Sequence, residues 1–421
     1  MSEVILRRMA AADVVRQARE PVDAPTLAAA AAIVDDVRRG GEAALRGQAV
    51  RLGDLQAAEP LVRSRAELDT AADRLNPKTR DLLERTAARI RNFAEAQRRS
   101  FADLTVSLPE GRAGHTVAPV ERAGCYAPGG RFPLVSSVLM TVIPARVAGV
   151  SEIWVASPRP SPEVLAAAAI AGADALLAVG GAQAIAALAF GVGGPPPCES
   201  IVGPGNRWVT AAKQLVFGRA AIDMLAGPSE LLILADETAD PVRVAADLLA
   251  QAEHDPDAWP ILVTTSETLA AGVEVQLQRQ LADLPTAATA RAALQNGFYV
   301  FVDDLEAGVA LCNRLAPEHL ELLAAEPWAL VPRLRHYGSL FIGEASAEVF
   351  GDYGFGPNHV LPTGGTARFV GGLSVFHFLR VRTWMAIDPE ADRRELTADA
   401  AALARLEGLA AHARAAETRR R

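Results

Sequence analysis

Apolar positions recur every three or four residues between residues 24 and 103. The stretches TLAAAAAIVDDVRRGGEAALRGQAV and KTRDLLERTAARIRNFAEAQRRSF are typical of this part. Such spacing places the apolar side chains on one face of an α-helix. We therefore expect this part of the chain to be wholly helical. A polar stretch rich in glycine and proline, DLTVSLPEGRAGHTVAPVERAGCYAPGGRFP, then separates it from the next domain.

From about residue 134 onward, short apolar runs alternate with helical patterns. The runs EIWVAS, ALLAV and SIVGPG predict strands, and PEVLAAAAIAG and AQAIAALAFG predict helices between them. A second series of the same kind contains the predicted strands ELLILAD, PILVTT and FYVFVDD. Short apolar strands that alternate with helices favour a parallel sheet with helices on both faces.

These patterns predict an α/β protein with two Rossmann-like parallel α/β domains between helical ends. We expect an N-terminal helical region over 1–105, a first α/β domain over 106–235, a second α/β domain over 236–375, and a C-terminal helical segment over 376–421.

Composition and charge exclude several classes of protein. Of the 421 residues, 50% are hydrophobic, and the formal net charge of −8 argues against binding to nucleic acid or to a membrane surface. The arginine-rich end, 414–421, is expected to be a solvated helix end. The chain has neither a signal-peptide core nor a long uncharged apolar run, so a cytoplasmic location is expected.

The three cysteines, Cys125, Cys198 and Cys312, lie far apart and form no CxxC pair. This spacing argues against a disulfide framework and against a thiolate zinc site. A metal would have to bind histidine, carboxylate or amide ligands.

The helix predicted after Asp240-Pro241 ends in AQAEHDPD. Gln251 and His254 lie about 60° apart on one face of this helix. The helix follows the strand ELLILAD, so its far end should lie near the start of the next strand, which is an unusual place for a site in an open sheet. Metal binding by Gln251 and His254 is one interpretation, and a solvated helix end is the other.

The motif RLAPEHLEL, 314–322, places Glu318 and His319 side by side. An adjacent acid and imidazole can divide proton transfer between them, because histidine titrates near neutrality and burial raises the pKa of a glutamate. The alternative is an ordinary helix start with Pro317 and Glu318 in its first turn.

Three further segments carry candidate functional residues. The loop EVFGDYGFGPNHVLPTGGTARF, 348–369, combines glycines with Asp352, Asn358 and His359, and here a functional interpretation is favoured. The turn GPGN, 203–206, can hold an anion but lacks the third glycine of a dinucleotide fingerprint. Similar glycine turns occur at 125–130 and 179–183.

Glu407 and His412 are both predicted to lie in the last helix, about 140° apart around its axis. They would therefore not share a face. An ordinary surface glutamate and a surface histidine are the alternative interpretation.

Taken in order, eight of these motifs resemble histidinol dehydrogenase over nearly the whole chain. The motifs are GCYAPGGRFPL, VGGAQAIAALAFG, VGPGNRWVTAAKQ, AIDMLAGPSELLILAD, LLAQAEHDPDA, LAPEHLEL, GDYGFGPNHVLPTGGTARF and LARLEGLAAHARA. The chain departs from the family pattern in reading GPNH where some members have GTNH, and in the bulky Arg207-Trp208 after GPGN.

The resemblance implies an enzyme that oxidises L-histidinol to L-histidine with two NAD, through an enzyme-held aldehyde. It assigns proton transfer to His319 and activation of water to Glu318. It implies one Zn²⁺ per subunit. The remaining assignments are zinc ligands Gln251, His254, Asp352 and His412, substrate contacts Ser229, His359 and Glu407, and NAD contacts Tyr126, Gln183 and Asn206.

The resemblance also implies a homodimer in which the C-terminal segment is swapped and His412 completes the partner's zinc site. Three alternatives remain open. A paralogue of the same fold would oxidise another amino alcohol or polyol. A zinc hydrolase would use Glu318 to activate a metal-bound water and would need no nicotinamide. A catalytically silent dinucleotide-binding or scaffold protein would have no need of Glu318 and His319.

Overall fold

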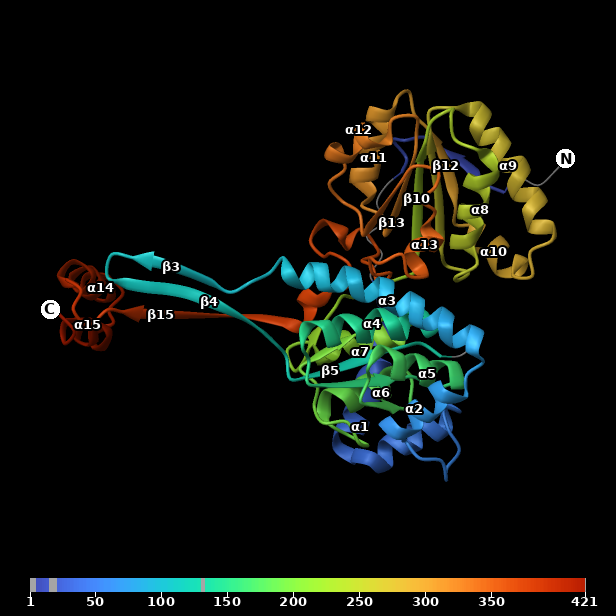
Figure 1. Cartoon of the computed structure of the whole chain (residues 1–421). Helices are drawn as coiled ribbons and strands as arrows, with labels where there is room; N and C mark the ends of the chain where they lie inside the picture. Colours follow the sequence, from blue (N-terminus) through green and yellow to red (C-terminus); the bar gives the residue numbers. More distant parts are fainter. Residues whose placement is uncertain (1–4, 15–20, 130–132, 421) are drawn as a thin grey trace. The chain divides into compact units, whose positions relative to one another are not determined.

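The computed structural model describes residues 5–14, 21–129 and 133–420 (Figure 1). The glycine turn predicted at 125–130 therefore ends on a residue outside the described part. The chain forms two compact units. Unit 1 comprises 1–97 and 120–378, and unit 2 comprises 98–119 and 379–421. In the described part, no helix combines the length and the apolar character that crossing a bilayer requires.

Unit 1 contains two six-stranded sheets, and the first has the strand order β2-β7-β6-β5-β8-β9. Only β2 runs antiparallel to its neighbour. The order reverses between β5 and β8, which makes their carboxyl ends the switch point where open α/β sheets bind ligands. The strands are β2 Val62–Ser64, β5 Arg122–Tyr126, β6 Glu152–Ala156, β7 Ala175–Leu177, β8 Ser200–Val202 and β9 Ala221–Ile222.

Helices cover both faces of this first sheet, and together they form the first lobe. One face packs against α1 (Ala24–Arg51), α6 (Gly181–Phe190) and α7 (Arg207–Val216) in an alanine- and leucine-rich core. The other face packs against α2 (Arg65–Arg74), α4 (Val135–Ala148) and α5 (Pro162–Ala171). Helices α1 and α2 are thus part of the first lobe and not a separate region, because α1 packs on α6 and α7 and α2 packs on α5.

The second sheet is wholly parallel, with the order β1-β12-β11-β10-β13-β14. Figure 1 shows α8, α9 and α10 on one face of it and α11 and α12 on the other. The strands are β1 Arg7–Met9, β10 Glu230–Ala235, β11 Trp259–Thr264, β12 Phe298–Phe301, β13 His319–Leu323 and β14 Ser339–Ile342. The helices are α8 Pro241–Ala252, α9 Glu267–Ala282, α10 Ala287–Leu294, α11 Leu305–Leu315, α12 Pro327–Leu330 and α13 Glu348–Asp352. These elements form the second lobe.

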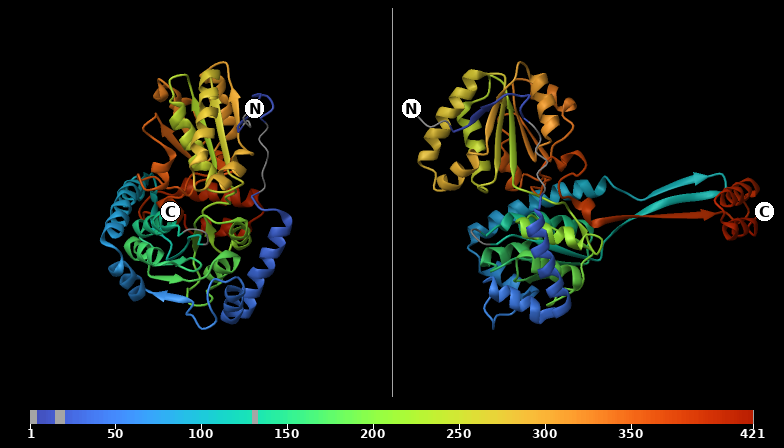
Figure 2. Two further views of the ribbon diagram at one scale, coloured as in Figure 1. Left: turned by 90° about the vertical axis from the view of Figure 1, so that its right-hand side faces the viewer. Right: turned by 180° about the vertical axis from the view of Figure 1, so that it is seen from behind.

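Unit 2 is a three-stranded antiparallel sheet with a pair of helices. The sheet has the order β15-β4-β3, and β15 (red) runs beside β4 (cyan) in Figure 1 and in the right-hand view of Figure 2. The strands are β3 Leu104–Leu108, β4 Gly111–Pro119 and β15 Leu379–Ile387. Helices α14 (Arg394–Leu406) and α15 (Ala410–Glu417) pack through Ala401, Ala404 and Ala413.

The two parallel α/β layers confirm the predicted fold class, but several boundaries were wrong. The stretch 24–103, which was predicted to be wholly helical, contains the strand β2 between helices α1 and α2. Its last helix is α3 (Pro77–Arg99). A boundary at 235 cuts off β10, which is a central strand of the second sheet. Residues 376–421 are not all helical, because β15 pairs with β4 along its whole length.

Candidate active site

A cavity of about 240 Å³ collects polar side chains from both lobes of unit 1. Of the twelve residues that the sequence assigns to a site, six line this cavity: Ser229, His254, Glu318, His319, Asp352 and His359. The first lobe contributes Pro128 after β5 and Pro204 and Gly205 after β8. These lie at the carboxyl ends of the two strands that flank the switch point.

The second lobe faces the cavity with the opposite edge of its sheet. Ser229 directly precedes β10, and His319 is the first residue of β13. His254 follows α8, which returns from the carboxyl end of β10. The predicted position of the α8 end near the start of the next strand is therefore correct. A site at the amino edge of the second sheet is nevertheless possible, because the switch point of the first lobe forms the other side of the cavity.

Glu318 and His319 are held by the main chain of Glu230. The N–H of Glu230 donates to Glu318 Oε2 at 2.8 Å, and His319 Nδ1 lies 3.0 Å from the Glu230 carbonyl oxygen. A carbonyl can only accept, so Nδ1 carries the proton and Nε2 is left with a lone pair. The alternative of a helix start was wrong, because α11 ends at Leu315 and the left-handed Ala316 (φ 53°) turns the chain into β13.

Burial sets the proton state of this pair. It lowers the pKa of His319 to about 4, against the opposing charge of Asp352, so the imidazole is neutral at neutral pH. Burial also raises the pKa of Glu318 well above its usual range. His319 Nε2 has no hydrogen-bond partner among the described residues and lies 3.9 Å from Asp352 Oδ1. The arrangement is that of a base with its lone pair available.

His254 and Asp352 form the part of the cavity suited to a cation. His254 Nε2 lies 3.2 Å from Asp352 Oδ2, and His254 Nδ1 lies 3.0 Å from the Ala250 carbonyl oxygen. Burial lowers the pKa of His254, but the hydrogen bond and charge of Asp352, the Ala250 carbonyl and the charge of Glu253 together outweigh burial, so the pKa of His254 is raised. Ligand atoms of His254, Asp352 and Glu348 all lie within 4.8 Å of one another. Imidazole and carboxylate donors of this kind fit Zn²⁺.

The sequence reasoning missed Glu348, although one signal could have identified it. Glu348 lies four residues before Asp352, so the two side chains share a face of a single helical turn in α13. The site therefore has a second carboxylate next to Asp352.

Gln251 lies behind the cavity and is fully buried. In the orientation that satisfies its amide, the side-chain nitrogen donates to Glu348 Oε1 at 3.2 Å and to the Glu230 carbonyl oxygen at 3.3 Å. The amide oxygen is the atom left for a metal, as expected for a hard donor.

The two predicted substrate contacts in unit 1, Ser229 and His359, both line the cavity. Ser229 stands at the start of β10 beside Gly227. His359 Nδ1 donates to the Asp352 carbonyl oxygen at 3.0 Å, which ties the loop after α13 to Asp352. Burial lowers the pKa of His359, so it is a neutral imidazole.

The predicted NAD contacts lie at the carboxyl edge of the first sheet, and none of them lines the cavity. The Tyr126 hydroxyl accepts from the Gly181 N–H at 3.1 Å. Gln183 Nε2 donates to Asp54 Oδ2 at 3.2 Å. The Asn206 side chain caps α7 by accepting from the Trp208 N–H at 3.1 Å. Their position suits a dinucleotide at the switch point, and their contact with NAD stays a prediction.

The turn before Asn206 is anchored by a buried ion pair that the sequence did not reveal. Lys213 pairs with Asp223, and both are buried. Lys213 Nζ donates to the Gly203 carbonyl oxygen at 3.0 Å, and Asp223 Oδ2 accepts from the Gly203 N–H at 2.7 Å. Both main-chain polar groups of Gly203 are thus satisfied, which fixes the start of the GPGN turn.

Glu407 and His412 belong to unit 2 and are both exposed there. They do not lie in one continuous helix as predicted, because α14 ends at Leu406 and Gly408 (φ 76°) turns the chain into α15. The angle of about 140° between them therefore has no meaning.

Comparison with known proteins gives one consistent result. A family model described as histidinol dehydrogenase matches residues 16–420. Histidinol dehydrogenase from Thermus thermophilus is 50% identical over 351 residues, 83% of this chain and 84% of the relative. The enzyme of that name from Geobacillus kaustophilus is 46% identical over 395 residues, 92% of each. The crystal structure of histidinol dehydrogenase from Elizabethkingia anophelis matches with a TM-score of 0.93 and 31% identity, covering 100% of this chain and 99% of that chain.

The buried carboxyl group of Glu321 should make the stability of the protein depend on pH. Glu321 is fully buried on β13, and its Oε1 accepts from the Glu348 N–H at 2.7 Å. Burial and the charge of Asp247 raise the pKa of Glu321 well above 4.5, so the folded state binds this proton more tightly than the unfolded state does. Stability from this group is present below the unfolded pKa and is lost as pH rises through the folded pKa.

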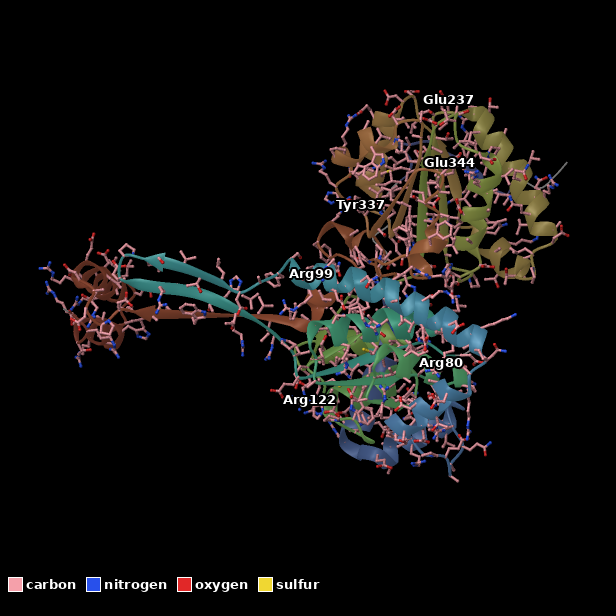
Figure 3. All side chains as sticks on the ribbon, in the orientation of Figure 1. Arg80, Arg99, Arg122, Glu237, Tyr337 and Glu344 are labelled. Atoms are coloured by element: carbon pink, nitrogen blue, oxygen red, sulfur yellow. The ribbon has the colours of Figure 1, made fainter. Side chains whose placement is uncertain are left out.

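We expect Glu321→Gln to reduce the decrease in stability with rising pH, because glutamine has no proton to release. Urea denaturation in EDTA between about pH 5 and about pH 8 should give a variant that gains stability relative to wild type as pH rises. Glu237→Gln, at the exposed glutamate labelled in Figure 3, is the control and should follow wild type. A difference between Glu321→Gln and wild type that does not change with pH would contradict the assignment.

Proposed function

The chain belongs to the histidinol dehydrogenase family, and from this we propose that it oxidises L-histidinol to L-histidine in two NAD-dependent steps. The observation that supports this most is the pairing of Glu318 with a neutral His319 whose Nε2 lone pair is available. Oxidation of an alcohol to a carboxylate requires both a base for the hydroxyl proton and a group that activates water. The two adjacent residues supply these functions at one carbon.

Zinc and NAD supply two parts of the proposed chemistry when they are bound: a cation that holds the substrate's amino and imidazole nitrogens, and an acceptor for hydride. On this chain, Gln251, His254 and Asp352 would hold the metal together with His412. Ser229, His359 and Glu407 would contact the substrate. Tyr126, Gln183 and Asn206 would contact the dinucleotide at the switch point of the first sheet.

His319 takes the hydroxyl proton onto Nε2 as the alcohol carbon loses its hydride. The Nδ1–H of His319 stays hydrogen-bonded to the Glu230 carbonyl oxygen, so the imidazolium that forms keeps its orientation. Glu318 then removes a proton from the water that adds to the enzyme-held aldehyde. The raised pKa of Glu318 suits it to this role near neutral pH. The second hydride leaves the hydrated carbon while His319, which has returned its first proton to water, accepts a hydroxyl proton, and the resulting acid ionises to the carboxylate.

The proposal includes a homodimer in which His412 and Glu407 of one chain complete the site of its partner. Two features of the separate units support it. Unit 2 exposes large apolar side chains, among them Met385, Leu403 and Leu406. Unit 1 exposes Phe355 and Phe369 in the loop that follows α13. Exposed apolar surface of this kind is typical of a protein interface.

We expect purified, zinc-loaded protein to form two NADH per L-histidinol. His319→Asn should lower kcat by about 10²- to 10⁴-fold, because the base is lost while its hydrogen bond to Glu230 can be replaced. Glu318→Gln should slow the second oxidation more than the first. Single-turnover measurement of NADH distinguishes the two steps. His336→Asn, at a histidine outside the cavity, is the control. If zinc-loaded wild type forms no NADH from L-histidinol, the proposed substrate is wrong.

Mixing two inactive variants tests the shared site. We expect His319→Asn and His412→Ala to be inactive alone and to recover about a quarter of wild-type activity after unfolding and refolding together. Half of the dimers would then be mixed, and each mixed dimer would have one intact site. Activity is followed as NADH formation, with each variant refolded alone as control. If His412 serves its own chain, no mixed dimer has an intact site and activity does not return.

A further inference from the structure

Glu348 is a buried carboxylate that the proposed chemistry leaves without a role. It begins α13 and is 1% exposed. Its Oε1 accepts from Gln251 Nε2 at 3.2 Å and lies 3.6 Å from His319 Nδ1. Its Oε2 has no hydrogen-bond partner within the described ranges. A buried carboxyl group with one oxygen left without a partner destabilises the fold, so its presence at this position needs an explanation.

The two nitrogens next to Glu348 share one acceptor, which is the carbonyl oxygen of Glu230. Gln251 Nε2 donates to the Glu230 carbonyl oxygen at 3.3 Å, and His319 Nδ1 donates to the same oxygen at 3.0 Å. The Glu230 carbonyl therefore holds both the amide of Gln251, a predicted metal ligand, and the imidazole of His319, the predicted base. The Glu348 carboxylate lies next to both groups. A change at this carbonyl would move both groups.

We propose that Glu348 is a positioning residue of the metal site, acting through the amide of Gln251. A glutamine binds a metal through its oxygen, so its nitrogen needs an acceptor that prevents the amide from turning over. Glu348 Oε1 and the Glu230 carbonyl provide two such acceptors, in the manner of the outer groups that orient metal ligands. The inference rests on the proposed metal site, because Gln251 has no metal to orient otherwise.

The competing role for Glu348 is to bind the metal directly. Replacing its carboxylate by an uncharged amide distinguishes direct binding from positioning of Gln251. A carboxylate ligand loses most of its affinity when it becomes an amide. If Glu348 serves only as an acceptor for the Gln251 N–H, Glu348→Gln should retain the metal affinity, because the new amide oxygen still accepts this hydrogen bond. The hydrogen bond from Gln251 favours the positioning role, because it already engages Glu348 Oε1.

The test is the Zn²⁺ dissociation constant of the full chain, measured after EDTA treatment by competition with a chromophoric chelator. We expect Glu348→Ala to weaken zinc binding by about 10- to 100-fold. Glu348→Gln should retain affinity within about threefold of wild type. Glu237→Ala is the control on the surface of the same lobe and should match wild type. Thermal melting of each variant identifies one that fails to fold.

A double-mutant cycle with Gln251→Ala shows whether Glu348 acts through the amide. In the Gln251→Ala background, adding Glu348→Ala should cost little further affinity, because its effect depends on the amide that is already absent. Equal losses in both backgrounds would overturn the inference, as would a Glu348→Gln loss as large as that of Asp352→Asn, which marks a direct ligand. Unchanged affinity in a folded Glu348→Ala would also overturn it. Failure of wild type to bind Zn²⁺ would instead refute the proposed metal site.

Discussion

The site depends on the main chain of one residue, Glu230, at the start of β10. Its N–H holds Glu318, and its carbonyl holds His319 and the amide of Gln251. Main-chain groups at the beginning of a central strand are fixed by the sheet around them, here by β11 and β13. Three side chains, one from α8 and two at the start of β13, are thus oriented by a rigid element. Such pre-organisation limits reorganisation during proton transfer.

The two lobes have the same strand order but contribute opposite edges to the cavity. The first lobe offers its carboxyl edge and switch point, the usual place for a nucleotide. The second offers its amino edge, where no switch-point cleft exists and where the end of α8 and the loop after α13 bring polar groups instead. We infer that the first lobe serves the dinucleotide and the second serves the metal and the proton transfers. A reacting carbon between them would be within reach of both.

The sequence predicted the regular elements of unit 1 well because their apolar runs are long and periodic. Strands β3 and β15 were missed because both are largely solvent-exposed, with polar or charged residues between the apolar ones. The alternation in Leu104, Val106 and Leu108 was nevertheless a strand signal. The end of α8 and the pair Glu318 and His319 could be identified as candidates, but only the fold brings them together. Glu348 was missed although its spacing of four residues from Asp352 places both on one helix face, whereas the Glu230 main chain escaped because a backbone acceptor leaves no mark in a sequence.

The central claim is that the Glu230 carbonyl holds His319 as a neutral imidazole with its proton on Nδ1. The most direct measurement is ¹⁵N NMR of the metal-free protein labelled at histidine, with His319→Asn used to assign the signal, between about pH 5.5 and about pH 8. The account predicts one His319 species throughout, with a protonated Nδ1 and an unprotonated Nε2. A proton on Nε2, or an imidazolium at neutral pH, would contradict it.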